Sequence, residues 1–250
     1  MPEPLPGTPG LTCPACRAAM RSLTLDGHYG TVVTIDRCGA CQAFWFDNRE
    51  HLQLAAGATL RLFEIIHEQH GPRQPLPDRL ECPRCQIRLL ATDDRQRATA
   101  FHYWRCGRGH GRFMTSFDFL REKDFIRPLD ERQLAELRAR VRSVNCSNCG
   151  APIDLAASTV CGYCRTPLAM IDFEQVGRVV NELREQASRP HSAGPQADAA
   201  LALALLRERQ QVDSLFRRLD GSPDWATLTE SGGIVENGLG AVVGLIKRLR

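Results

Sequence analysis

The sequence predicts a small metal-stabilised α+β protein made of three zinc ribbons, each a short β-hairpin closed by zinc knuckles. Amphipathic helices join the ribbons, and a helical C-terminal region follows them. Three observations predict this fold class. All of the eleven cysteines except Cys106 fall into C-x2-C pairs, the segments between the predicted ribbons have helical apolar spacing, and only 6% of the residues are aromatic. We therefore expect a thin apolar core, for which bound metal compensates.

The first ribbon is predicted from two pairs, CPAC and CGAC. Its four expected ligands are Cys13, Cys16, Cys38 and Cys41. Between the pairs, the β-rich residues 23–25 and 31–35 flank the turn dipeptide Asp26-Gly27, which indicates a hairpin. Zinc accepts four cysteine sulfurs in a tetrahedron, and two knuckles at one end of a hairpin supply them.

A helix is expected directly after the first ribbon. Asp47 and Glu50 have the spacing of a capping box, so the helix should begin there and extend to about Gln69. Its apolar stripe should contain Leu52, Ala55, Ala56, Leu62, Phe63 and Ile66.

With these residues identified, the segment of about 11–66 resembles the bacterial zinc ribbons of the transcription factor IIB type. That family combines a CPxC knuckle, an LDG hairpin, a second C-x2-C knuckle, and then a tryptophan, an aspartate and a glutamate that opens a helix. The matching residues here are Cys13–Cys16, Leu25-Asp26-Gly27, Cys38 with Cys41, Trp45, Asp47 and Glu50. Gln42, Ala43 and Arg49 stand where the family often has glycines. The resemblance implies a zinc-binding module and says little about activity.

The second ribbon is predicted as a diverged repeat of the first, at about residues 80–123. Its expected ligands are Cys82, Cys85, Cys106 and His110. The histidine takes the place of a fourth cysteine, and Cys3His is an accepted structural zinc set. Phe113 keeps an aromatic position after the ligands, and residues 117–123 have a helical pattern.

The third ribbon is predicted to be shorter, because few residues separate its pairs. Its expected ligands are Cys146, Cys149, Cys161 and Cys164. Residues 151–154 and 158–160 leave room for only a minimal hairpin. The same four thiolates could hold iron in a rubredoxin-like centre, so iron stays an alternative to zinc here. The twelve ligands together predict three zinc ions.

Amphipathic helices are expected around the third ribbon. Asp130 should cap one whose inner face contains Leu134, Leu137, Val141 and Val144. A second should start near Asp172 and bury Val176, Val179, Val180 and Leu183.

The C-terminal region is expected to begin after a linker rich in proline and glycine. A helix should run from Asp198 to the Gly221-Ser222-Pro223 break. Its apolar residues are Leu201, Leu205, Leu206, Val212, Leu215, Phe216 and Leu219. The glycine-rich segment 231–250 should dock on its own chain or be disordered, the alternative being a partner or an anionic membrane surface. The expected boundaries are 1–70 for ribbon one and its helix, 71–129 for ribbon two, 130–187 for ribbon three, 188–197 for the linker and 198–250 for the helical tail.

Nucleic-acid binding is the alternative that the charge pattern leaves open. The net charge is only +3, whereas a dedicated duplex binder shows a strong basic face. The candidate patch surrounds ribbon two, with Tyr103 and Trp104 for stacking on bases. Its arginines are Arg84, Arg88, Arg95, Arg97, Arg105, Arg108 and Arg112.

We therefore expect a non-catalytic zinc-binding scaffold or adaptor that mediates protein–protein interaction through partners that the sequence does not identify. The alternative is a transcription-factor-like zinc-ribbon protein that binds nucleic acid. No P-loop, dinucleotide-binding glycine run, G-x-S-x-G or H-E-x-x-H motif is present, so we do not expect an enzyme. No apolar run is long enough to span a membrane and residues 1–10 do not resemble a signal peptide, which favours the cytoplasm. Oligomerisation is left open.

Overall fold

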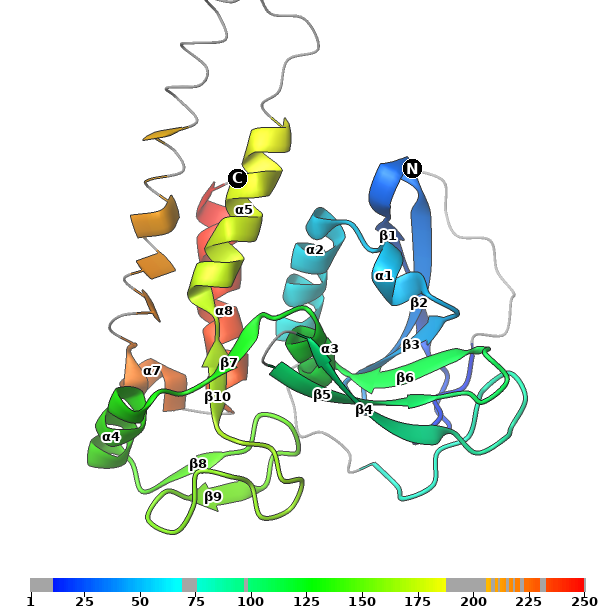
Figure 1. Ribbon diagram of the computed structural model, residues 1–250, viewed down its shortest axis with the longest axis horizontal. Helices are drawn as coiled ribbons and strands as arrows, with labels where there is room; N and C mark the ends of the chain where they lie inside the picture. Colours follow the sequence, from blue (N-terminus) through cyan, green and yellow to red (C-terminus); the bar gives the residue numbers. More distant parts are fainter. Residues whose placement is uncertain are drawn as a thin grey trace, which may run out of the picture.

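The computed structural model shows a small α+β protein with a helical C-terminal region (Figure 1). It describes residues 11–68, 76–96, 99–187, 206–207, 210, 212–214, 216–217, 219–220, 223–229 and 233–249. The predicted linker, as well as Leu201, Leu205, Leu215 and Arg97, lies outside these residues. No helix within the described ranges is long and apolar enough to cross a membrane.

A six-stranded antiparallel sheet contains the hairpins of both the first and the second cysteine set. Its strands, in spatial order, are β1 (Arg21–Asp26), β2 (Val32–Cys38), β3 (Ala43–Asp47), β6 (Gly111–Thr115), β5 (Thr99–Arg105) and β4 (Leu90–Gln96). The predicted first hairpin is confirmed, with Leu25 opposite Val33 and a short 3-10 turn, His28–Gly30, at its tip. The two halves meet where β3 pairs with β6, and Trp45 lies opposite Phe113. The sheet therefore consists of two three-stranded meanders joined at their third strands.

Strand β3 is buried on both faces, which its uninterrupted apolar sequence explains. Phe44 and Phe46 point into the main core, which extends from the sheet to the C-terminal helices. Trp45 points the other way, into a small core around the first two cysteine sets. The core is thus larger than the low aromatic content led us to expect, because aliphatic residues of the C-terminal helices also contribute to it.

The helix expected from Glu50 to Gln69 is broken into α1 (Glu50–Gln53) and α2 (Ala56–His67). Leu54 between them is extended and forms a β-bridge with Gly27, so it is buried while Leu52 is 57% exposed. Only half of the expected capping box forms. Glu50 accepts the backbone N–H of Asp47, but the Asp47 carboxylate binds Trp45 and Arg84 instead.

After the sheet, helix α3 (Ser116–Glu122) matches the predicted segment closely, and α4 (Glu131–Arg140) begins at the predicted capping box. The box pairs Asp130 with Gln133. Helix α4 ends earlier than expected, however, since Val141 is already extended and Val144 belongs to strand β8 (Ser143–Asn145). Strand β8 pairs with β9 (Pro152–Asp154), so the minimal hairpin expected between 151–154 and 158–160 does not form. Val160 instead bridges to Pro167.

The C-terminal helices pack against the chain's own core. Strand β10 (Ala169–Ile171) pairs with β7 (Ile126–Pro128) and leads into α5 (Phe173–Ala187), which begins after Asp172 as predicted. Val176 and Val180 are buried, whereas the side chain of Leu183 lies outside the described part.

Helices α7 (Trp225–Thr229) and α8 (Ile234–Leu249) complete this layer, and α8 contacts α2, α5 and β10 (Figure 1). Val242 and Val243 are buried, and a Cβ added at Gly240 would lie 2.9 Å from the His67 ring on α2. Residues 233–249 of the glycine-rich tail therefore dock on their own chain, which is one of the two expected outcomes. The described apolar side chains of this helix that the chain covers are Ile234, Val235, Leu239, Val242 and Val243.

Candidate metal centres

The structure brings the twelve predicted ligands together in three groups of four, in the order in which they occur along the chain. Each residue offers one ligand atom, and the four atoms of each group lie within 4.8 Å of one another. The groups are cluster one (Cys13, Cys16, Cys38, Cys41), cluster two (Cys82, Cys85, Cys106, His110) and cluster three (Cys146, Cys149, Cys161, Cys164). Each set could hold one metal ion.

The distances within the clusters fit tetrahedral coordination. Ligands about 2.3 Å from a zinc ion would be roughly 3.8 Å apart. In cluster one the Sγ atoms of Cys13 and Cys41 are 3.9 Å apart, and those of Cys16 and Cys38 are 3.5 Å apart. Disulfide sulfurs would be bonded at about 2.05 Å, and all eleven cysteines are free.

Cluster two includes the histidine that replaces a fourth cysteine. The Nδ1 atom of His110 lies 3.7 Å from the Sγ of Cys82 and 3.6 Å from that of Cys106. The loop between Cys106 and His110 has one more residue than a C-x2-C knuckle. Gly109 in that loop has a φ of 79°, which glycine adopts without steric cost. A solvent-exposed loop histidine would not lie among three sulfurs, so the geometry favours a ligand role for His110.

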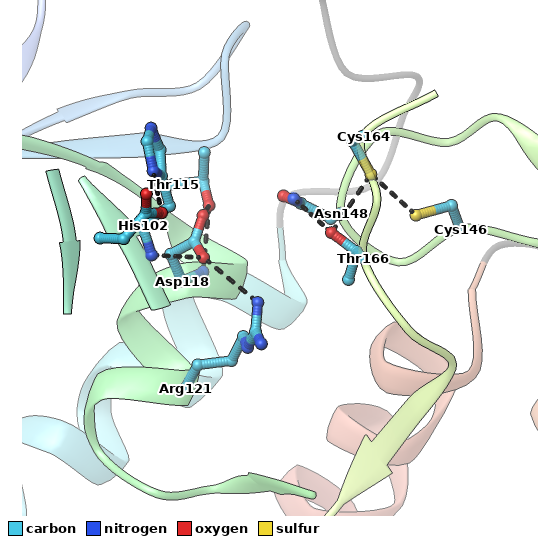
Figure 2. Close-up of polar contacts among 9 residues, drawn as sticks. His102, Thr115, Asp118, Arg121, Cys146, Asn148, Cys164 and Thr166 are labelled. Atoms are coloured by element: carbon cyan, nitrogen blue, oxygen red, sulfur yellow. Dashed lines mark hydrogen bonds and ion pairs between the residues drawn. The ribbon is translucent and has the colours of Figure 1, made fainter. Parts of the chain in front are cut away.

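Cluster three has similar dimensions although fewer residues separate its two C-x2-C pairs. The distances from Cys146 to Cys164 and from Cys149 to Cys161 are both 3.6 Å between Sγ atoms. The hydroxyl of Thr166 lies 3.2 Å from the Cys164 sulfur and also accepts a hydrogen bond from the Asn148 amide (Figure 2). The sequence did not predict these contacts of Thr166 and Asn148 behind the ligands, because a threonine and an asparagine near a knuckle have no distinctive spacing.

All five C-x2-C pairs share a backbone conformation that orients their sulfurs. The residue after each second cysteine has a positive φ: Arg17, Gln42, Gln86, Gly150 and Arg165. Only one of the five is a glycine, so the other four occupy a left-handed conformation that costs side chains about 1 kcal/mol. Gln42 thus adopts the left-handed conformation without loss of the knuckle.

Backbone N–H groups within the knuckles point at the sulfurs, with Ala15 N to Cys13 Sγ and Cys41 N to Cys38 Sγ both at 3.4 Å. Hydrogen bonds to a thiolate favour its ionised form. In cluster one, hydrogen bonds from Cys13 and Cys41 lower the pKa of Cys38 to about 2, whereas the pKa of Cys41 is raised. The Cys38 sulfur is thus favoured as a thiolate, whereas the pKa values of Cys13 and Cys41 are raised, so metal binding to these two thiols would release protons.

Clusters one and two are connected to each other. Arg17, directly after cluster-one Cys16, forms an ion pair with Glu81, directly before cluster-two Cys82. Between the clusters lies the small core, whose apolar members are Met20, Ala43, Trp45, Leu80, Leu89 and Phe113. Cluster three contributes to the main core instead. Comparisons with protein-family models, with curated proteins and with solved structures found no match for this chain.

Proposed function

We propose that the three clusters are structural zinc sites and that each belongs to a zinc ribbon. The supporting observation is that each cluster has four protein ligands, which leaves no vertex of a tetrahedron for water or substrate. Zinc bound there would hold two knuckles together. Cluster three could hold iron with the same donors, and zinc is our choice for all three.

We also propose that ribbon one is of the transcription factor IIB type and that ribbon two is its diverged repeat. The symmetric strand order, β1-β2-β3 against β6-β5-β4, supports the repeat, because each half contributes one three-stranded meander. Free thiols need a reducing compartment, which supports a cytoplasmic location.

The function that we propose is a non-catalytic scaffold or adaptor for protein partners. Two features of the expected nucleic-acid patch argue against the alternative. Arg84 forms an ion pair with Asp47, and the guanidinium of Arg112 lies over the ring of Tyr103, 4.2 Å from the ring centroid. Tyr103 itself is buried, so it cannot stack on a base. Five described arginines of the patch are exposed: Arg84, which pairs with Asp47, and Arg88, Arg95, Arg105 and Arg108.

The described residues of the C-terminal helical region offer little free apolar surface to a partner. Val212 and Phe216 are buried against the chain's own core, and only Leu206 of the described residues expected there is largely exposed. We therefore propose that the adaptor surface lies elsewhere.

Affinity capture at two salt concentrations, with and without nuclease, tests the adaptor proposal. We expect captured proteins to survive nuclease treatment and to be unaffected by the double change Arg105→Gln and Arg108→Gln. Phosphate-dominated binding would instead weaken steeply with salt. Capture that depends on nucleic acid and on the two arginines would contradict the proposal.

A further inference from the structure

A cavity of about 850 Å³ lies between the second hairpin and the loops of cluster three. His102 and Trp104 of β5 and Arg121 of α3 line one side, and Asn148 and Tyr163 line the other. Figure 2 shows Asp118 and Arg121 on one side of this space and Asn148 with Thr166 on the other. The volume lies within the range of natural ligand sites. The metal clusters do not open into a vacant ligand position, so this cavity is a separate feature.

Arg121 supplies a cation to the cavity, where it forms a long ion pair with Asp118. Its side chain is 17% exposed, and its Nη1 lies 3.8 Å from Asp118 Oδ1, beyond hydrogen-bond distance. Asp118 is already satisfied by the Thr115 hydroxyl at 2.8 Å and the His102 N–H at 3.1 Å. Among the described residues the Arg121 guanidinium forms no hydrogen bond, although it pairs with Asp118 and lies 5.7 Å from the centroid of the Phe117 ring. A guanidinium has five N–H donors, so Arg121 can bind the oxygens of an anionic group that enters the cavity.

Aromatic and proline side chains accompany this cation. Trp104 is half-buried, and Tyr163 is 87% exposed although it stands between two cluster-three ligands. Pro77 and Pro167 add apolar surface. Aromatic residues beside an arginine are the usual anchors of protein–protein contacts.

The charges around the cavity distinguish between two classes of macromolecule. Asp78 and Asp93 are exposed on the hairpin side, and Arg165 is exposed on the loop side. A nucleic-acid backbone carries a phosphate at every nucleotide and would meet both carboxylates. A peptide can carry one carboxylate for Arg121 and neutral or basic side chains elsewhere. The charge pattern therefore favours a peptide.

We infer that this cavity binds a short segment of a partner protein, with a carboxylate on Arg121 and an aromatic or proline side chain against Trp104 and Tyr163. The inference rests on the proposed adaptor function and assigns it a surface. The carboxylate can come from an acidic side chain or from a chain terminus. Because loops between the cluster-three ligands form one wall, the peptide site depends on that cluster.

A synthetic random peptide library tests the inference on the intact zinc-loaded protein. Half of the library has free C-termini and half has amidated C-termini. We expect selected peptides to share a carboxylate and to bind Arg121→Gln about tenfold more weakly or worse, the loss of one charged hydrogen bond. Tyr163→Ala should also weaken binding, and its exposure makes misfolding no concern. Arg88→Gln, which removes an exposed charge outside the cavity, is the matched control.

The source of the carboxylate follows from which half of the library supplies the selected peptides. Selection from the free-carboxyl half alone assigns the site to chain termini, and selection from both halves assigns it to acidic side chains. Peptides that bind both cavity variants as well as the unchanged protein would overturn the cavity site and leave the adaptor function standing. If no peptide binds and an oligothymidylate probe does, both the cavity site and the adaptor function are wrong.

Discussion

Arg84, inside the first knuckle of cluster two, forms an ion pair with Asp47 at the end of β3, and its Nε donates to Asp47 Oδ1 at 2.7 Å. The indole N–H of Trp45 donates to the same oxygen, also at 2.7 Å. Burial alone would raise the pKa of Asp47, but the hydrogen bonds from Arg84 and Trp45 lower it overall. A knuckle of cluster two thus contacts β3 through Arg84 and Asp47, and β3 is the strand that carries Trp45 of the small core.

Removal of this contact should weaken the connection between the first two clusters. We expect Asp47→Asn and Arg84→Gln each to lower the free energy of unfolding by about 1 kcal/mol, as for a partly exposed ion pair. A double-mutant cycle measured by urea denaturation should give a coupling of similar size. Strictly additive effects would show that the ion pair contributes nothing.

Gly111 should tolerate no side chain, because β3 passes too close to it. A Cβ there would lie 2.3 Å from the carbonyl oxygen of Phe46 and 2.9 Å from the Trp45 ring. We expect Gly111→Ala to destabilise the protein by roughly 2 kcal/mol, as in overpacked cores. Gly107→Ala is the control in the same loop, since its Cβ would make only an ordinary contact at 3.6 Å. Equal melting temperatures for the two variants would disprove the close approach.

Loss of cluster two should affect cluster one. Both clusters border the small core. Unfolding of the knuckles of cluster two in Cys82→Ser should therefore expose Trp45 and Phe113. We expect the metal of cluster one to transfer to a chromophoric chelator faster in this variant than in the unchanged protein. Cys146→Ser is the control, because cluster three packs in the main core. Unchanged transfer rates in Cys82→Ser would mean that the clusters are independent.

The ionisation of Glu50 should reduce stability near neutral pH. Burial, followed by repulsion from Asp47 and Asp36, raises its pKa to about 7. The unfolded chain has the lower pKa, so the folded state loses stability as pH rises from about 4.5 to about 7, and the loss persists above that range. Glu50→Gln should therefore be more stable by about 1 kcal/mol at pH above 7, a value reduced for solvent screening.

Denaturation of the Glu50→Gln variant and the unchanged chain across this pH range checks the sign. The stability gap between them should widen up to about pH 7 and then stay constant. A gap that narrows with rising pH would contradict the assignment. Gln keeps the acceptor for the Asp47 N–H, so the comparison isolates the charge.

Local patterns predicted the parts of the structure that depend on neighbouring residues. The grouping of the twelve ligands, the first hairpin and the starts of α4 and α5 all follow from spacings within a few residues. The histidine in cluster two could be expected because the ligand count closes only when His110 is included.

Long-range pairing could not be predicted in this way. Nothing in the local sequence shows that Trp45 pairs with Phe113, because strand register depends on partners far along the chain. The break at Leu54 has the same origin, since its bridge partner Gly27 lies in the hairpin turn. The spacing of Val144 also fitted the apolar stripe of a helix, but Val144 pairs with Ile153 and therefore lies in a strand.

Metal content of the intact chain tests the central claim most directly. Native mass spectrometry of purified protein, combined with elemental analysis, should give three zinc ions per chain and no visible thiolate-to-iron absorption. Two zinc ions per chain, or iron in place of zinc at cluster three, would contradict the proposal that three closed zinc sites hold this fold together.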